Sequence, residues 1–137
     1  MKDLYNNIEV ESVLDPIAFD TTATYTDLDL QGFNSACLLI HVGLDASMDG
    51  SNKIVFTLKD SADGTTYANV ETDDMLELTV ASGVVLTVDA ATEDNTLYKL
   101  GYVGGKRYLE LTATVTGTVD PPMSIVLVKG HPEMAAV

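Results

Sequence analysis

His41 and His131 are the two histidines of the sequence and the residues best suited to acid–base chemistry or to holding zinc. A hydrolase needs a nucleophile beside a positioned base, and neither histidine lies in a motif of that kind. His41 falls inside an apolar run, which favours the core or a sheet face, and His131 precedes Pro132, which favours a surface turn. They lie far apart and lack the short ligand spacing of zinc motifs. We therefore predict no catalytic residue and no metal ligand.

Aspartate-rich loops raise the question of calcium, whose ligands are carboxylate and carbonyl oxygens. Residues 45–50, with the sequence Asp-Ala-Ser-Met-Asp-Gly, are the best local candidate. They lack the alternating acids and the final glutamate of an EF-hand loop, so we interpret them as a structural turn. The acidic pairs 73–74 and 93–94 are adjacent in sequence, so their side chains should point apart and form no acid/base couple. No cofactor is expected.

Lys106 and Arg107 form the one adjacent basic pair of the sequence, at the end of the segment Gly-Tyr-Val-Gly-Gly-Lys-Arg-Tyr over residues 101–108. The segment lacks the glycine spacing of a phosphate-binding loop, and no helical pattern follows it. Two glycines favour a tight turn instead. The basic pair is then either a contact point for a partner or a solvated turn whose charges offset nearby acids.

The composition is strongly acidic, with 21 acidic and 7 basic residues, a net charge of −14 and a pI near 4.1. Such a chain repels nucleic acid and anionic membranes, so we expect neither as a partner. The sequence has no apolar run of the ~20 residues that a membrane helix needs, and its start has no apolar leader, which predicts synthesis in the cytoplasm. The single Cys37 excludes a disulfide framework and is expected to be buried.

Alternation of apolar and polar residues with a period of two dominates the chain and predicts β-strands. Arg107–Thr116 and Lys53–Lys59 alternate most clearly. Ala36–Val42 and Met123–Val128 are apolar on nearly both faces, which is typical of central strands in a packed sandwich. Shorter strands are expected at residues 24–30, 66–70, 75–80, 84–88 and 97–102, which makes about eight strands in all.

Turn residues separate these strands. Asp63-Gly64 predicts a tight hairpin, Asp120-Pro121-Pro122 a fixed corner, and residues 90–94 at most one helical turn. We therefore expect an all-β protein with a single antiparallel β-sandwich, either jelly-roll or immunoglobulin-like. Residues 15–130 form the sandwich, residues 1–14 an N-terminal arm or first strand, and residues 131–137 a C-terminal tail.

Several short segments carry a resemblance to a known family. They are Met1–Leu4 with Asn7-Ile8, residues 29–33, the turn of Ser61, Asp63 and Gly64, residues 98–108, and Gly130-His131-Pro132. The segment 101–108 is the most specific. Through these segments the chain resembles small head-associated proteins of tailed phages and prophages, which are encoded beside the major capsid protein.

The resemblance implies a capsid decoration or cement protein without enzymatic activity. Such a protein binds the outer surface of the major capsid protein lattice, stabilises the head, and resides on the exterior of the virion after synthesis in the host cytoplasm. Its partner would be the major capsid protein, with self-association on the capsid as a further option. The candidate capsid contacts are Leu4, Tyr5, Ile8, Lys106, Arg107 and His131.

Two other functions stay open at this point. One is a structural component of the viral neck or tail, where β-sandwiches also serve. The other is a calcium- or glycan-binding β-sandwich module, which the aspartate-rich loops and Tyr5, Tyr25 and Tyr67 would suit.

Overall fold

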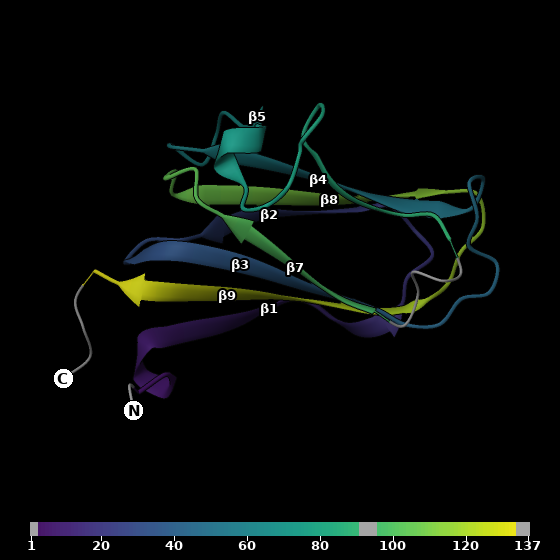
Figure 1. Cartoon of the computed structure of the whole chain (residues 1–137), viewed down its shortest axis with the longest axis horizontal. Coiled ribbons are helices and arrows are strands. Elements are labelled where there is room, and N and C mark those ends of the chain that lie inside the picture. Colours follow the sequence, from purple (N-terminus) through teal and green to yellow (C-terminus); the bar gives the residue numbers. More distant parts are fainter. Residues whose placement is uncertain (1–2, 91–95, 134–137) are drawn as a thin grey trace.

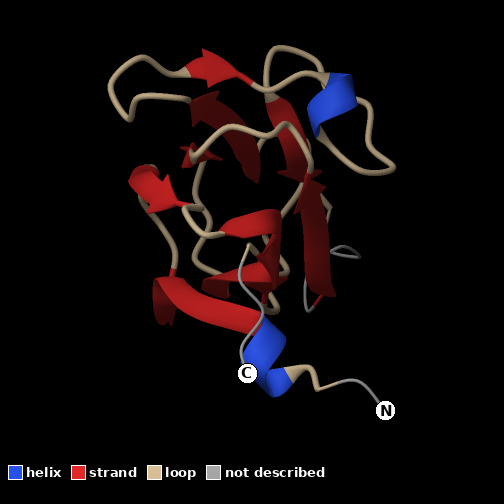
Figure 2. Ribbon diagram, turned by 90° about the vertical axis from the view of Figure 1, so that its left-hand side faces the viewer, coloured by secondary structure: helices blue, strands red, loops and turns tan. Residues whose placement is uncertain are grey.

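The computed structural model describes residues 3–90 and 96–133, which fold into two antiparallel sheets packed face to face (Figure 1). The strands are β1 (Ile8–Ala18), β2 (Ala23–Asp29), β3 (Phe33–Val42), β4 (Lys53–Ser61), β5 (Ala68–Asn69), β6 (Val84–Val88), β7 (Thr96–Tyr102), β8 (Tyr108–Thr116) and β9 (Pro122–Pro132). Two short 3-10 helices, η1 (Tyr5–Asn7) and η2 (Thr72–Asp74), lie on opposite outer sides of the sandwich (Figure 2). The prediction of an all-β sandwich is confirmed.

The order of the strands is that of a jelly roll. The first sheet runs β1-β9-β3-β7 and the second runs β2-β8-β4, with β5 and β6 both pairing with the outer edge of β4. If β5 and β6 are counted as one position at the edge of β4, each sheet has four positions. Successive positions then lie in different sheets except for β4 and this edge position, as in a double-sheet jelly roll. The jelly-roll alternative of the expected fold therefore holds, and the immunoglobulin-like one does not.

The core lies between the sheets and follows the predicted alternation. In β4, Ile54, Phe56 and Leu58 are fully buried, and in β8, Leu109 and Leu111 are fully buried. Alternate residues of β3 and β9 meet them from the other sheet, namely Leu38, Ile40, Val42, Met123, Ile125 and Leu127. Burial of these side chains is the main source of stability, since each contributes roughly 1.5–3 kcal/mol relative to exposure.

Of the shorter strands that the sequence predicts, one is wrong and one is shortened. Residues 75–80 form no strand, although Met75 makes one isolated bridge to Tyr102. The preceding turn explains the difference, because Glu71 and Asp74 cap η2 reciprocally and Glu77 adopts a positive φ of 55°, which breaks an extended path. The strand expected at 66–70 is reduced to Ala68–Asn69.

The Asp63-Gly64 turn is longer than a two-residue hairpin. Gly64 has the positive φ that favours glycine, at 74°, whereas Asp63 does not have a positive φ. Asp63 instead accepts hydrogen bonds from the amides of Thr65 and Thr66 and from the Ser61 hydroxyl. These bonds shape the loop that joins β4 to β5 and hold the pKa of Asp63 low, at about 2.

The first and last strands, β1 and β9, both belong to the first sheet. β1 pairs with β9 from Ile8 opposite Gly130 to Ala18 opposite Pro122, with two register shifts. The proline corner before β9 is fixed by the Phe19 amide, which donates to the Pro121 carbonyl. Except for Ala90, the helical turn expected at 90–94 lies outside the described residues.

Candidate docking surface

The central part of the outer face of the β1-β9-β3-β7 sheet is largely apolar. Residues directly opposite one another in antiparallel strands share a face, and Val10, Val128, Cys37 and Gly101 form one such row across the four strands. The next outward row contains Ser12, Val126, Leu39 and Lys99. Within these two described rows, Lys99 is the one formally charged side chain. The layer beneath this face is the buried core, so these residues point toward solvent.

The residues that face outward from the second sheet are mostly polar. Thr24, Thr112 and Thr57 form one row across β2, β8 and β4, and the hydroxyls of Thr24 and Thr112 lie 3.0 Å apart. A further pair on this face joins Lys59 to Glu110 at 3.9 Å. One outer face of the sandwich is therefore suited to water and the other to an apolar partner.

A groove of about 1130 Å³ lies at one end of the apolar face. Its floor includes Cys37, Val128 and Gly101, and its lining extends to Leu4 and Ile8 near the β1 edge. On the β7 side it is bounded by residues 76–78. Its volume exceeds the roughly 300–1,000 Å³ of sites for small ligands, so it suits a segment of a macromolecule better.

The 76–78 wall is anchored to the sheet through Gly101. The Leu76 amide donates to the Gly101 carbonyl at 3.0 Å, and a Cβ on Gly101 would come within 3.0 Å of the Leu76 side chain. Glycine at this position therefore lets Leu76 lie close against the strand, while 58% of the Leu76 residue stays exposed. The wall is thus positioned by the fold and still presents an apolar side chain.

Three of the six predicted contact residues meet at this groove. Leu4, Ile8 and His131 all line it, because β1 pairs with β9 and brings residues 4–8 close to residue 131. His131 has a positive φ of 52°, and its Nδ1 lies 2.8 Å from the Ser35 hydroxyl. Tyr5 is 87% exposed on η1 and does not line the groove.

Lys106 and Arg107 lie elsewhere, around a smaller hollow of about 380 Å³. Both are engaged within the chain. Lys106 Nζ pairs with Asp60 at 3.1 Å, and Arg107 makes two 2.9 Å hydrogen bonds to the Asp29 carboxylate. This bidentate pair lowers the pKa of Asp29 to about 2. Of the two interpretations of this basic pair, the geometry favours charges that offset nearby acids.

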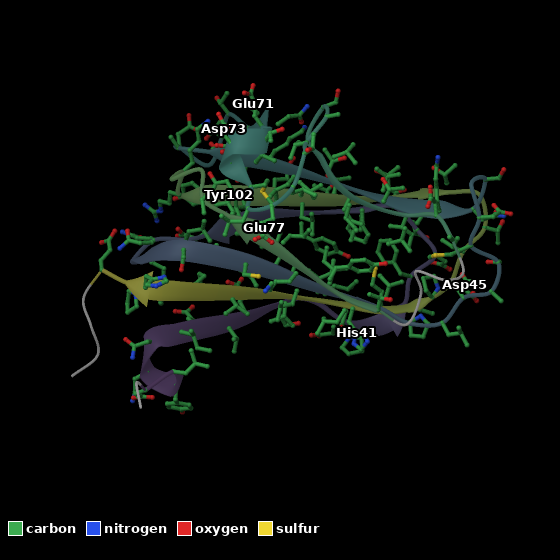
Figure 3. The ribbon with its side chains drawn as sticks, in the orientation of Figure 1. His41, Asp45, Glu71, Asp73, Glu77 and Tyr102 are labelled. Atoms are coloured by element: carbon green, nitrogen blue, oxygen red, sulfur yellow. The ribbon has the colours of Figure 1, made fainter. Side chains whose placement is uncertain are left out.

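The remaining sequence candidates have structural settings. His41 is exposed on β3, and Figure 3 shows it at the lower sheet, far from Tyr102. Asp45 is buried and accepts hydrogen bonds from the Ser47 hydroxyl at 2.5 Å and from the Asp120 amide at 2.9 Å. Burial acts to raise the pKa of Asp45, but these bonds outweigh it and the pKa lies below its usual value. Asp45 therefore joins two loops, in agreement with a structural turn.

Cys37 differs from expectation because it is half-buried on the outer face and not in the core. Burial raises the pKa of its thiol, and Lys99 partly opposes this shift. Alternation explains its position, since its neighbours Ala36 and Leu38 take the inward places. Together with Leu76 and Val128, Cys37 belongs to the site residues that the sequence did not single out.

Within residues 3–90 and 96–133, no group of three or more His, Cys, Asp or Glu side chains is arranged to hold a metal ion. None of the helices in this part of the chain has the length and apolar character to cross a membrane.

Comparisons with known proteins give little. No family model and no curated protein matches the chain. Among solved structures, one described as the structure of infectious bursal disease virus, Gx strain, aligns over 93% of this chain and 33% of its own, with 9% identity and a TM-score of 0.34. This chain therefore spans about a third of that one. A likeness of this degree assigns neither a family nor a function.

Proposed function

We propose that this chain is a non-enzymatic structural protein of a virion, a capsid decoration protein that binds the outer surface of the major capsid protein lattice and stabilises the head. The observation that carries the proposal is the contrast between the two outer faces of the sandwich. A protein that works alone in water gains nothing from an outward-facing apolar row such as Val10, Val128 and Cys37. A protein that is attached to a lattice through one side gains binding energy from such a row.

The architecture is compatible with the same function. A jelly roll is a rigid scaffold found in viral coat proteins and in sugar-binding domains, so the fold alone does not choose between them. The resemblance of residues 101–108 and of both chain ends to head-associated phage proteins favours the first. The pairing of β1 with β9 places Leu4, Ile8 and His131, three of the residues expected to touch the capsid, beside the same groove.

Many copies are essential to the proposed mechanism. One docked module of this size contributes modest binding energy, but repetition over a symmetric shell links neighbouring subunits many times over. A neck or tail component, in contrast, occurs in a few copies at one vertex. Copy number therefore separates the proposal from its nearest alternative.

The test is quantitative mass spectrometry of purified particles, with isotope-labelled peptides of this chain and of the major capsid protein as standards. The proposal predicts an abundance within a few fold of that of the major capsid protein. A handful of copies per particle would assign the chain to the neck or tail. Absence from particles would overturn the virion role.

A further inference from the structure

The groove on the apolar face has chemistry that defines its occupant. Its floor and walls are apolar at Cys37, Val128, Leu76 and Leu78, so a partner must bring apolar side chains. Its length crosses several strands, from Leu4 and Ile8 near β1 to residues 76–78 beside β7. An extended peptide segment fits this shape, because alternate side chains of such a segment can enter the groove.

The charge of this chain favours basic residues on either side of the apolar part of that segment. Four of the seven basic residues, Lys59, Lys106, Arg107 and Lys129, are committed to ion pairs within the chain. The field around the molecule is therefore set by its excess of acids, and Asp3 and Glu77 stand at the groove itself. Lys99 supplies one positive charge there. A partner segment with basic residues beside its apolar centre gains from this field.

A second copy of this chain fits the groove less well. Each copy carries a net charge of −14, so two acidic surfaces would have to approach one another around the apolar face. Opposite charge on the partner removes that cost. The charge balance therefore favours a basic partner over self-association.

The geometry points to the groove formed by Leu4, Ile8, Cys37, Leu76 and Val128 as the seat of an extended capsid-protein segment, apolar at its centre and flanked by lysine or arginine. This inference rests on the proposed decoration function and names the part of the partner that this chain holds. The segment lies across the strands, with Leu4 and Ile8 at one end of the groove and the Leu76 wall at the other.

Cys37 provides a direct probe, because it is the single cysteine of the chain and lies on the groove floor. N-ethylmaleimide labelling of Cys37, read by mass spectrometry of its peptide, should be at least tenfold slower in intact particles than in the free chain. If Cys37 is labelled in particles that contain the chain as fast as in the free chain, the groove is not the binding site of a capsid segment. The proposed decoration function would be unaffected by that result.

A variant pair tests the wall. Leu76→Asp places a repelled charge in the groove, whereas Leu44→Asp makes the same change at a residue 71% exposed, just beyond the far end of β3. Both positions are exposed, so both variants should fold, and matching melting curves would verify this. In co-sedimentation with heads lacking the protein, Leu76→Asp should bind at least tenfold more weakly than wild type and Leu44→Asp within twofold of it. Equal binding by the two variants would contradict the proposal that the groove binds a capsid segment. Absence of the wild-type chain from particles and heads would contradict both this proposal and the proposed decoration function.

Discussion

Asp60 is a buried carboxylate that links the two sheets. It lies on β4 with 2% exposure, and it accepts hydrogen bonds from the Tyr102 hydroxyl on β7 at 2.8 Å and from Lys106 Nζ at 3.1 Å. Burial and the bond to Asp60 raise the pKa of Tyr102 well above its usual value, so the hydroxyl stays protonated and donates. The Lys106 amide donates to the same hydroxyl. Tyr102 thus supplies one of the donors to the buried acid and accepts the hydrogen bond that positions the basic turn.

Tyr102→Phe should lower the free energy of unfolding by about 1–3 kcal/mol, because it leaves a buried carboxylate short of one donor. The matched control is Tyr67→Phe, whose hydroxyl donates to Asp27 in an exposed setting, and whose loss should cost within about 0.5 kcal/mol. Urea denaturation of the two variants measures both. Equal losses would show that the Asp60 network does not hold the sheets together.

The Asp29–Arg107 pair predicts a change of stability in acid. The pKa of Asp29 in the fold, about 2, lies below its ordinary value of 3.8, so the ionised form is favoured by folding. This stabilisation is fully present above about pH 3.8 and is lost as the pH falls through about 2. Because both side chains are more than a third exposed, solvent screening limits the effect to about 1 kcal/mol or less.

Asp29→Asn should therefore unfold at lower urea concentration than wild type at pH 6, and the difference should shrink as the pH falls from about 4 to about 2. The control is Asp20→Asn, at an exposed carboxylate that pairs with the adjacent Thr21 hydroxyl. A difference for Asp29→Asn that stays constant down to pH 2 would contradict the ion-pair account.

Among the elements, the β3–β4 loop gives a test of the calcium alternative. The Asp45 carboxylate already accepts bonds from Ser47 and from the Asp120 amide, and these bonds tie this loop to the one before β9. A calcium ion would have to break them. We expect 5 mM calcium chloride to shift the melting temperature by no more than the same ionic strength of sodium chloride, as measured by circular dichroism. A calcium-specific rise of several degrees would support the calcium-binding module instead.

β1 is a strand of the first sheet and not a detachable arm, because it pairs with β9 from Ile8 onward. A chain that begins at Ile8 should melt within about 3 °C of wild type, since it loses only residues before the strand. A chain that begins at Asp15 loses much of β1 and exposes the edge of β9, so its melting temperature should fall by at least about 10 °C. Similar melting of the two truncations would show that the pairing adds little.

The sequence predicts the central strands well and the edges poorly. Alternation marked β4 and β8 because their inward residues meet the core directly. The strand predicted at residues 75–80 is absent because η2 is capped reciprocally and Glu77 has a positive φ. These are local backbone effects that the spacing of apolar residues does not reveal. Pairing of the chain ends was beyond the sequence, since a jelly roll is built from contacts between residues far apart.

The sequence pattern of the candidate docking face is consistent with two arrangements. Ala36–Val42 and Met123–Val128 are apolar on both faces, a pattern typical of strands covered on both sides. In the structure one side is the core and the other, with Cys37, Leu39 and Val128, faces outward. The spacing of apolar residues in the sequence does not distinguish a strand that is buried on both faces from one with an outward apolar face that a partner covers. The order of strands and the packing of the two sheets are needed to distinguish these two arrangements.

At the scale of the whole molecule, the charge of −14 acts against the compact fold through repulsion among its surface acids. Added salt screens this repulsion over a Debye length of about 10 Å at 0.1 M. The melting temperature should therefore rise by a few degrees between 20 and about 500 mM sodium chloride, as measured by calorimetry. A fall over this range would mean that the internal ion pairs outweigh the repulsion.

The central claim is that the chain braces a capsid from outside. Its most direct test is the temperature at which DNA leaves full heads, followed with an intercalating dye, for heads lacking this protein and for the same heads saturated with it. The account predicts release at a temperature several degrees higher after saturation, with the Leu44→Asp variant equal to wild type and Leu76→Asp ineffective. An unchanged release temperature at saturating binding would contradict the claim.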